Sequence, residues 1–170
     1  NILFVPNDEA VAAERLGLSV ADLRAKLALI KDKLFAARTQ RVHPGLDDKI
    51  LTAWNGLMLA SLSEAARVLD RQDYRVAAER NATFLRDHML TNGDRLLRTY
   101  NHGVAKGNGY LEDYANFIDA LIELYQTTFD EEWFTLAQAL ANAALTHFRA
   151  DDGGFFDTSD DHETLITRPR

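Results

Sequence analysis

Apolar residues recur along this chain at spacings of three and four, which predicts a series of amphipathic α-helices. The first predicted helix spans about residues 19–40. It begins at a capping-box-like segment in which an acidic residue, Asp22, follows Ser19 by three positions, and Pro44-Gly45 then forms a connector. Its apolar stripe consists of Leu23, Leu27, Ile30 and Leu34.

Four further helices are predicted in two pairs. The first pair covers about residues 48–69 and a second helix that Asp73 caps at its N-terminus. The second pair covers 111–128 and a helix that follows a polar turn at 130–132. The helix from Asp48 has a wide apolar stripe, which predicts burial on more than one side. That stripe includes Ile50, Trp54, Leu57, Met58, Leu62, Val68 and Leu69.

Glycine-rich connections follow each pair. Asn92-Gly93 is expected to close the third helix, and residues 96–100 could form a short strand before the loop at 103–109. The second pair ends in the same way, with glycines at 153–154 and an extended segment from Phe155.

A shift of about 60 residues superimposes the two pairs, which indicates an internal repeat. The matches include Trp54 with Tyr114, Leu57 with Phe117, Met58 with Ile118, Asp70 with Asp130 and Leu85 with Leu145. We therefore predict an all-α fold of antiparallel helical hairpin repeats, with short β segments in the long loops. The predicted single domain, 1–170, divides into an orphan helix at 19–40, a first hairpin repeat with its long loop at 47–109, and a second at 110–170.

The connections alternate between short and long, and this predicts two different ends of the helical stack. Short turns should lie at one end and the long loops at the other, where functional sites usually lie. Acidic and aromatic motifs follow the long loops. Acid–base chemistry could therefore use Asp47, Asp48, Glu112 and Asp113, with one carboxyl kept protonated by apolar surroundings. For a glycosidase, the separation of two such carboxyls would decide between inversion and retention.

The residues that could bind a substrate at this end are Trp54, Asn55, Tyr110, Tyr114, Asp157 and Arg168. A structural interpretation competes with each role. Asp48 and Asp113 lie at predicted helix starts, where a carboxylate caps backbone N–H groups. Trp54 and Tyr114 lie on apolar helix faces and could be core residues. Asn55 with Gly56 indicates either close packing or a lined cavity.

Composition excludes several other classes of function. The chain has 170 residues, a formal charge of −7 and no cysteine, so disulfides and thiolate metal sites are absent from it. The negative charge argues against nucleic acid as a partner, and no apolar run is long enough for a membrane span. We predict a cytoplasmic protein without a cofactor. The histidines lack paired spacing and the aspartates of 151–161 do not match an EF-hand, so no metal site is predicted.

Four segments of the sequence resemble one known family. The stretches 47–58 (DDKILTAWNGLM), 110–115 (YLEDYA) and 153–158 (GGFFDT), with Arg168-Pro169, resemble the spermatogenesis-associated, thioredoxin-like protein family. The resemblance implies a thioredoxin-like domain followed by an (α/α)6 toroid like those of six-hairpin glycosidases and N-acylglucosamine 2-epimerases. This chain would be an interior fragment of that toroid, whose other part is the remainder of its own chain.

Two functions remain open at this point. The first is a carbohydrate-active, glycosidase- or epimerase-like toroid that binds a small sugar at the long-loop end. The second is a non-catalytic helical scaffold or protein-interaction module attached to a thioredoxin-like domain. In either case we expect the fragment alone to be inactive, and its open apolar flank to favour self-association.

Overall fold

The computed structural model describes residues 4–163 and 166–170. These residues form two compact units, the first ending at Asp47 and the second beginning at Asp48. The first unit contains α1 (Glu9–Leu16) and α2 (Val20–Thr39). The predicted cap of α2 is confirmed, because the Ser19 hydroxyl accepts a hydrogen bond from the Asp22 N–H over 3.0 Å. Helix α1 was not predicted, and the stripe of α2 beyond Leu23 is exposed in this unit.

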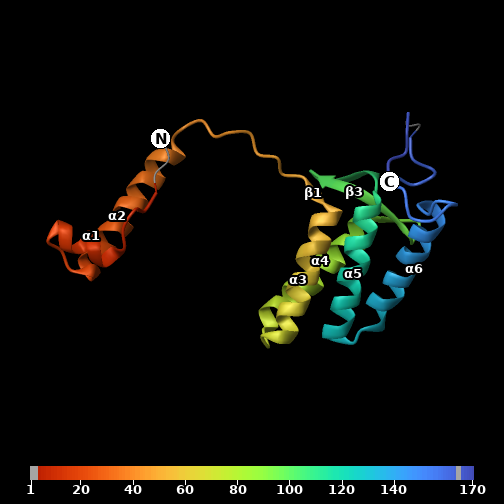
Figure 1. Cartoon of the computed structure of the whole chain (residues 1–170), viewed down its shortest axis with the longest axis horizontal. Coiled ribbons are helices and arrows are strands. Elements are labelled where there is room, and N and C mark those ends of the chain that lie inside the picture. The colour runs from red at the N-terminus through yellow and green to blue at the C-terminus, as the bar shows by residue number, and fades with distance from the viewer. Residues whose placement is uncertain (1–3, 164–165) are drawn as a thin grey trace. The chain divides into compact units, whose positions relative to one another are not determined.

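The second unit contains two helical hairpins, as the repeat predicted. They are α3 (Thr52–Val68) with α4 (Gln72–Met89), and α5 (Leu111–Thr128) with α6 (Glu131–His147). Figure 1 shows α3 and α5 side by side, with α6 beyond α5. The core lies between the four helices, and its largest fully buried side chains include Tyr114, Phe117, Phe148, Leu59, Leu85 and Met89. The all-α hairpin-repeat fold is therefore confirmed.

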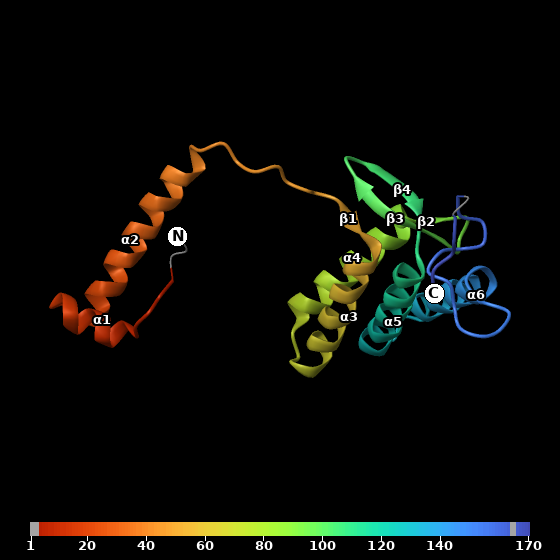
Figure 2. The ribbon, with the colours of Figure 1, turned by 45° about the horizontal axis from the view of Figure 1, so that its top comes forward.

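Four short strands lie at the end of the unit where α3 and α5 begin (Figures 1 and 2). Strand β3 (Arg95–Asn101) pairs in antiparallel fashion with β1 (Ile50–Leu51), β2 (Leu90–Thr91) and β4 (Val104–Asn108). The predicted strand at 96–100 is confirmed. The glycine-rich stretch after it, predicted as a loop, contains β4.

Two helix boundaries differ from the prediction. The helix expected from Asp48 begins at Thr52, because Ile50 and Leu51 pair with Tyr100 and Thr99 in the sheet. Asp73 is not the N-cap of α4. Arg71 occupies the N-cap position. Asp73 lies in the first turn of α4, and its carboxylate binds the Arg71 guanidinium at 2.6 Å.

The turn at Asn92-Gly93 also has a different role from the one predicted. Helix α4 ends at Met89, and this turn instead connects β2 to β3. Both of its residues have positive φ, a backbone conformation that glycine and asparagine adopt more readily than most residues. The repeat extends into the loops here, since Leu90 pairs with Leu96 while Arg149 forms an isolated bridge with Phe155, 59 residues further on in each case.

Helices α3 and α5 approach each other closely at Gly56. A Cβ atom built there would lie 2.9 Å from the backbone carbonyl carbon and oxygen of Asn116. Of the two interpretations of Asn55-Gly56, close packing is thus confirmed for Gly56.

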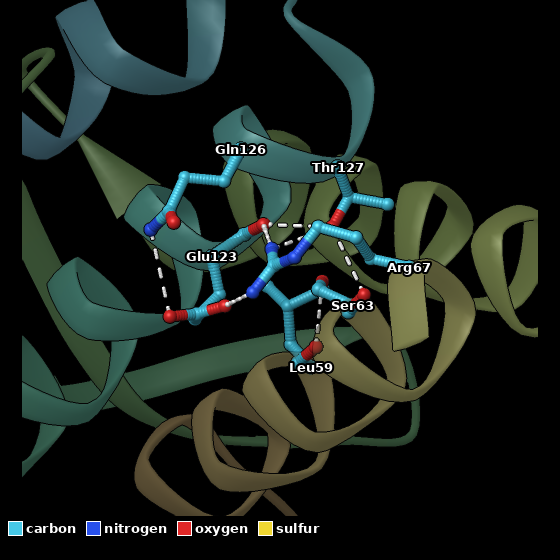
Figure 3. A network of polar contacts seen from close by, with 6 residues as sticks. All are labelled: Leu59, Ser63, Arg67, Glu123, Gln126 and Thr127. Carbon is cyan, nitrogen blue, oxygen red and sulfur yellow. Dashed lines mark hydrogen bonds and ion pairs between the residues drawn. The ribbon is translucent and has the colours of Figure 1, made fainter. Parts of the chain in front are cut away.

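A polar network joins the other ends of α3 and α5 (Figure 3). Arg67 binds the Glu123 carboxylate at 2.9 Å and donates to the Thr127 hydroxyl at 3.3 Å. The Thr127 hydroxyl lies 2.9 Å from the Ser63 carbonyl oxygen, and the buried Ser63 hydroxyl donates to the Leu59 carbonyl. Contacts at both ends therefore fix the two helices in register.

Part of the predicted apolar stripe of α3 is exposed, contrary to the prediction of burial. Trp54, Leu57 and Met58 have exposed fractions of 69%, 55% and 57%. Tyr114 and Phe117, the repeat counterparts of Trp54 and Leu57, are buried, and Ile118, the counterpart of Met58, is partly buried. Among the described residues, no helix combines the length and apolarity needed to cross a membrane.

Replacing Gly56 with alanine tests the close approach. The added methyl group would force the two backbones apart, at a cost of about 1–3 kcal/mol that the gain in helix propensity of about 1 kcal/mol only partly offsets. Urea unfolding of Gly56→Ala should therefore show lower stability. Gly45→Ala is the control, since its methyl group meets nothing within 4 Å. Equal stability of the two variants would contradict the packing argument.

The exposed face of α3 predicts concentration-dependent association of the chain. Sedimentation velocity should show larger species as the concentration rises, and Leu57→Glu should shift them toward the monomer. Val104→Glu is a matched control, because Val104 has a similar exposed fraction but lies in β4. A strictly monomeric chain over a wide concentration range would contradict the expectation.

Candidate functional site

The first turn of α5 carries the acidic pair Glu112 and Asp113. The Leu111 N–H donates to the Asp157 carbonyl over 2.9 Å, which attaches the start of α5 to the loop after α6. The Tyr110 N–H donates to the Asp113 carboxylate over 2.8 Å, so Asp113 caps its own helix.

The Asp113 carboxylate also caps the neighbouring hairpin. Its Oδ1 accepts the Ala53 N–H at 2.9 Å, in the first turn of α3, and its Oδ2 accepts from Arg98 at 3.1 Å. The residue is fully buried. Burial raises the pKa of the Asp113 carboxyl, and the Tyr110 N–H, the Arg98 charge and the Ala53 N–H oppose that rise. The cap interpretation of Asp113 is confirmed, for two helices instead of one.

Arg98 of β3 links the acidic pair to an aromatic ring. Its guanidinium lies 2.9 Å from the Glu112 carboxylate, 3.1 Å from that of Asp113, and 4.0 Å from the centre of the Tyr110 ring. Sequence reasoning missed this residue, although a charged side chain between apolar positions of a predicted strand was a usable signal.

A cavity of about 570 Å³ lies beside this group. Its wall is formed by Arg98, Tyr110, Glu112, Asp157, Thr158, Thr167 and Pro169. Three of the predicted site residues, Tyr110, Glu112 and Asp157, thus share one cavity. The Glu112 side chain is 55% exposed, so its carboxylate can meet a ligand. The Tyr110 ring is covered by Arg98, and the His162 ring lies 5.7 Å from it, which leaves it poorly placed to stack on a sugar.

Arg168, predicted to bind substrate, holds the segment 166–170 against the loop after α6. It donates to the carbonyl oxygens of Thr158 at 2.5 Å and His147 at 3.3 Å, and its guanidinium lies 4.2 Å from the Phe156 ring centre. The Asp157 N–H donates to the Pro169 carbonyl at 3.0 Å. Arg168 therefore has a structural role behind the cavity wall, which its neighbours Thr167 and Pro169 help to form.

Asp47 and Asp48 are not in that wall. Asp48 lies at the β3–β4 turn, where its carboxylate accepts from the Asn101 amide at 2.8 Å and lies 3.7 Å from His102. Asp48 therefore does not cap α3, although the structural interpretation of the sequence expected it to do so. Asp47 is an exposed residue at the end of the first unit.

The remaining predicted residues lie elsewhere on α3 and α5. Tyr114 is a core residue, 1% exposed, whose hydroxyl accepts the Leu96 N–H at 2.9 Å, so it cannot reach a ligand. Trp54 is exposed, so the core interpretation does not hold for it, and its role in binding stays a prediction. Asn55 lines a second cavity of about 390 Å³, whose wall also includes Ile50, Ala77, Arg80, Asn81 and Phe84.

One group of side chains among the described residues has the spacing of a metal site. Ligand atoms of His147, Asp160 and Asp161 lie within 4.8 Å of one another. His147 and Asp160 are already paired at 2.7 Å, and Arg95 binds Asp161 at 2.5 Å. Both aspartates thus already have partners within the protein, and the group gives no positive reason for assigning a metal.

The arrangement of two hairpins with a polar, strand-bearing end matches the helical toroids of sugar-processing enzymes. A cellobiose 2-epimerase from Bacillus thermoamylovorans superimposes with a TM-score of 0.64 at 19% identity, over 73% of this chain and 33% of its own. A sugar epimerase from a ruminal bacterium gives 0.63 at 16% identity, over 69% and 31%. A GH76 α-mannanase from Bacteroides thetaiotaomicron gives 0.60 at 17% identity, over 69% and 34%. The chain therefore has the fold of a partial (α/α) toroid.

Sequence comparison identifies the relatives. Spermatogenesis-associated protein 20 of rat and of human are each 35% identical over 163 residues, which cover 91% of this chain and 21% of theirs. An uncharacterised protein of Caenorhabditis elegans is 31% identical over 156 residues. No family model matches the chain. The predicted resemblance is confirmed: this chain is similar to spermatogenesis-associated protein 20 over most of its own length, and it spans about a fifth of the length of those relatives.

Because Asp113 caps two helices, Asp113→Ala should destabilise the fold more than the loss of an ordinary helix cap does. This change removes acceptors from two helix starts and leaves the partly buried Arg98 with fewer partners, so it should lower the free energy of unfolding by about 2–4 kcal/mol. Asp130→Ala is the matched control, because Asp130 caps only α6, through the Glu132 N–H at 3.0 Å. It should cost about 0.5–2 kcal/mol. Equal losses in urea unfolding would contradict the double cap.

Proposed function

We propose that the cavity beside α5 binds a carbohydrate, and that Glu112 acts in it as an acid–base group. The observation that carries this proposal is the meeting of two carboxylate residues, Glu112 and Asp157, in one cavity wall. The wall is built on long loops at the start of a helix, and the fold is shared with proteins named as sugar epimerases and a mannanase. Fold similarity by itself would not support this function.

Glu112 fits the acid–base role better than Asp113. Its side chain is more than half exposed, and the Arg98 guanidinium holds it at 2.9 Å. Asp113 is fully buried, and both of its oxygens already accept hydrogen bonds from the protein. Asp157 supplies the second carboxyl in the same wall, while Asp48 lies with Asn101 and His102 at the β3–β4 turn. The proposed pair is therefore Glu112 and Asp157.

A non-catalytic scaffold is the second candidate function. It is favoured by one specific observation, the use of Asp113 as a cap for two helices, because an acidic motif explained by capping needs no substrate. In that case Glu112 would serve only to neutralise Arg98. Sugar binding separates the two candidates, since a scaffold predicts none.

The chain spans about a third of each matched toroid structure, and this bears on activity. Most of the wall of a toroid pocket would come from other hairpins, so we propose that this chain binds sugars weakly and does not turn them over alone. The roles of Trp54 and Asn55 in a complete pocket, and a cytoplasmic location, stay predictions.

Glu112→Gln tests the proposed site. Saturation-transfer NMR of the chain with glucose, mannose and cellobiose should show binding, and the variant should weaken it about tenfold, because a hydrogen bond to a charged acceptor contributes about 1.5–3 kcal/mol. The control is Glu131→Gln, which makes the same charge change at the start of α6, roughly 25 Å away beyond the far end of α5. Binding that Glu112→Gln leaves unchanged would rule out this cavity, and no binding at all would favour the scaffold.

A further inference from the structure

The cavity beside α5 contains more fixed negative charge than it can neutralise. Glu112 and Asp157 lie in its wall, Asp113 is directly behind Glu112 in the sequence, and Arg98 is the only basic residue among the wall residues of the described structure. We propose that this cavity selects sugars by charge, and accepts neutral or amine-bearing sugars while it excludes acidic ones such as uronates and sugar phosphates. This inference rests on the proposed carbohydrate function and specifies its substrate class.

Arg98 is not available to bind an acidic ligand. Its guanidinium already contacts two carboxylates, at 2.9 Å and 3.1 Å, and lies over the Tyr110 ring at 4.0 Å. An anion could recruit Arg98 only by displacing Glu112 or by leaving the buried Asp113 carboxylate unpaired. Removing one partner of a buried charge pair is strongly unfavourable, so the arginine stays committed to the protein.

The other arginines near the cavity are also committed. Arg95 pairs with Asp161 at 2.5 Å, and Arg170 pairs with Asp152 at 2.7 Å. Arg168 directs its Nη2 to two backbone carbonyls. The Nε of Arg168 and the Nη1 of Arg95 have no hydrogen-bond partner among the described residues, but both atoms are buried and so are out of reach of a ligand. None of these three residues is part of the wall. The charge that an incoming ligand meets is therefore set mainly by Glu112 and Asp157.

Neutral hydrogen-bonding groups remain for an uncharged sugar. Thr158 and Thr167 line the cavity. The exposed Thr167 offers a neutral hydroxyl to a ligand, whereas the Thr158 hydroxyl oxygen is itself buried and has no hydrogen-bond partner among the described residues. A hydroxyl can both donate to and accept from a sugar hydroxyl. A protonated amine on the sugar would gain further from the two carboxylates.

A titration with three sugars of similar size tests this inference. Glucosamine, glucose and glucuronate are compared at neutral pH and low ionic strength by saturation-transfer NMR of the 170-residue chain. We expect the affinities to fall in the order glucosamine, glucose, glucuronate. Glucuronate should bind at least about tenfold more weakly than glucose, because its negative charge would lie close to a wall whose net charge is negative. Added salt should reduce the difference in affinity between glucose and glucuronate. Glu112→Gln should also reduce this difference, because it removes a negative charge from the wall and releases Arg98. Glu131→Gln should leave it unchanged.

The outcomes distinguish this inference from the proposed function. Glucuronate that binds as tightly as glucose, or more tightly, would overturn the charge selection and leave carbohydrate binding intact. Glu131→Gln could also reduce the difference in affinity between glucose and glucuronate as much as Glu112→Gln does. That difference would then come from the overall charge of −7 and not from the cavity, which would also overturn the inference. Absence of binding for all three sugars would overturn the proposed function, and the charge selection with it.

Discussion

The Asp113 carboxylate lies where α3, α5 and β3 meet, and it supplies the acceptors that each of them needs. It accepts the Ala53 N–H from α3, the Tyr110 N–H at the start of α5, and a hydrogen bond from Arg98 of β3. Buried helix starts without such partners are costly. Because one carboxylate serves all three elements, the two hairpins and the sheet cannot shift independently. The close approach at Gly56 then sets the distance between the helices.

The position of the cavity follows from this constraint. Successive residues on an α-helix point about 100° apart, so when Asp113 faces α3, its neighbour Glu112 must face another direction. That direction is the cavity, where the Glu112 side chain remains more than half exposed. Arg98 contacts both carboxylates and thereby connects the structural residue to the exposed one. The acidic pair thus divides into one residue for the fold and one for a ligand.

The helices and their repeat could be predicted from the sequence because they depend on local spacing. The capping of α2 by Ser19 is local in the same sense. The start of α3 could not be predicted, since Ile50 and Leu51 become a strand only by pairing with residues about 50 positions away. Arg98 was missed for a similar reason, because its partners on α5 are neighbours only in the folded chain. The sequence predicted that Tyr110, Glu112 and Asp157 lie at the same end of the helical stack. It did not predict that they share one cavity.

Trp54 and Tyr114 occupy equivalent repeat positions, yet one is exposed and the other is buried. Tyr114 is covered because the Leu96 N–H donates to its hydroxyl and Phe148 packs against its ring at 5.0 Å. Both contacts come from elements that follow the first hairpin. A repeat at the edge of an array exposes residues that an interior repeat buries. Aromatic residues in equivalent sequence positions therefore do not have equivalent roles here. The acidic pair, whose two members have fixed and opposite environments within one unit, is the better guide to function.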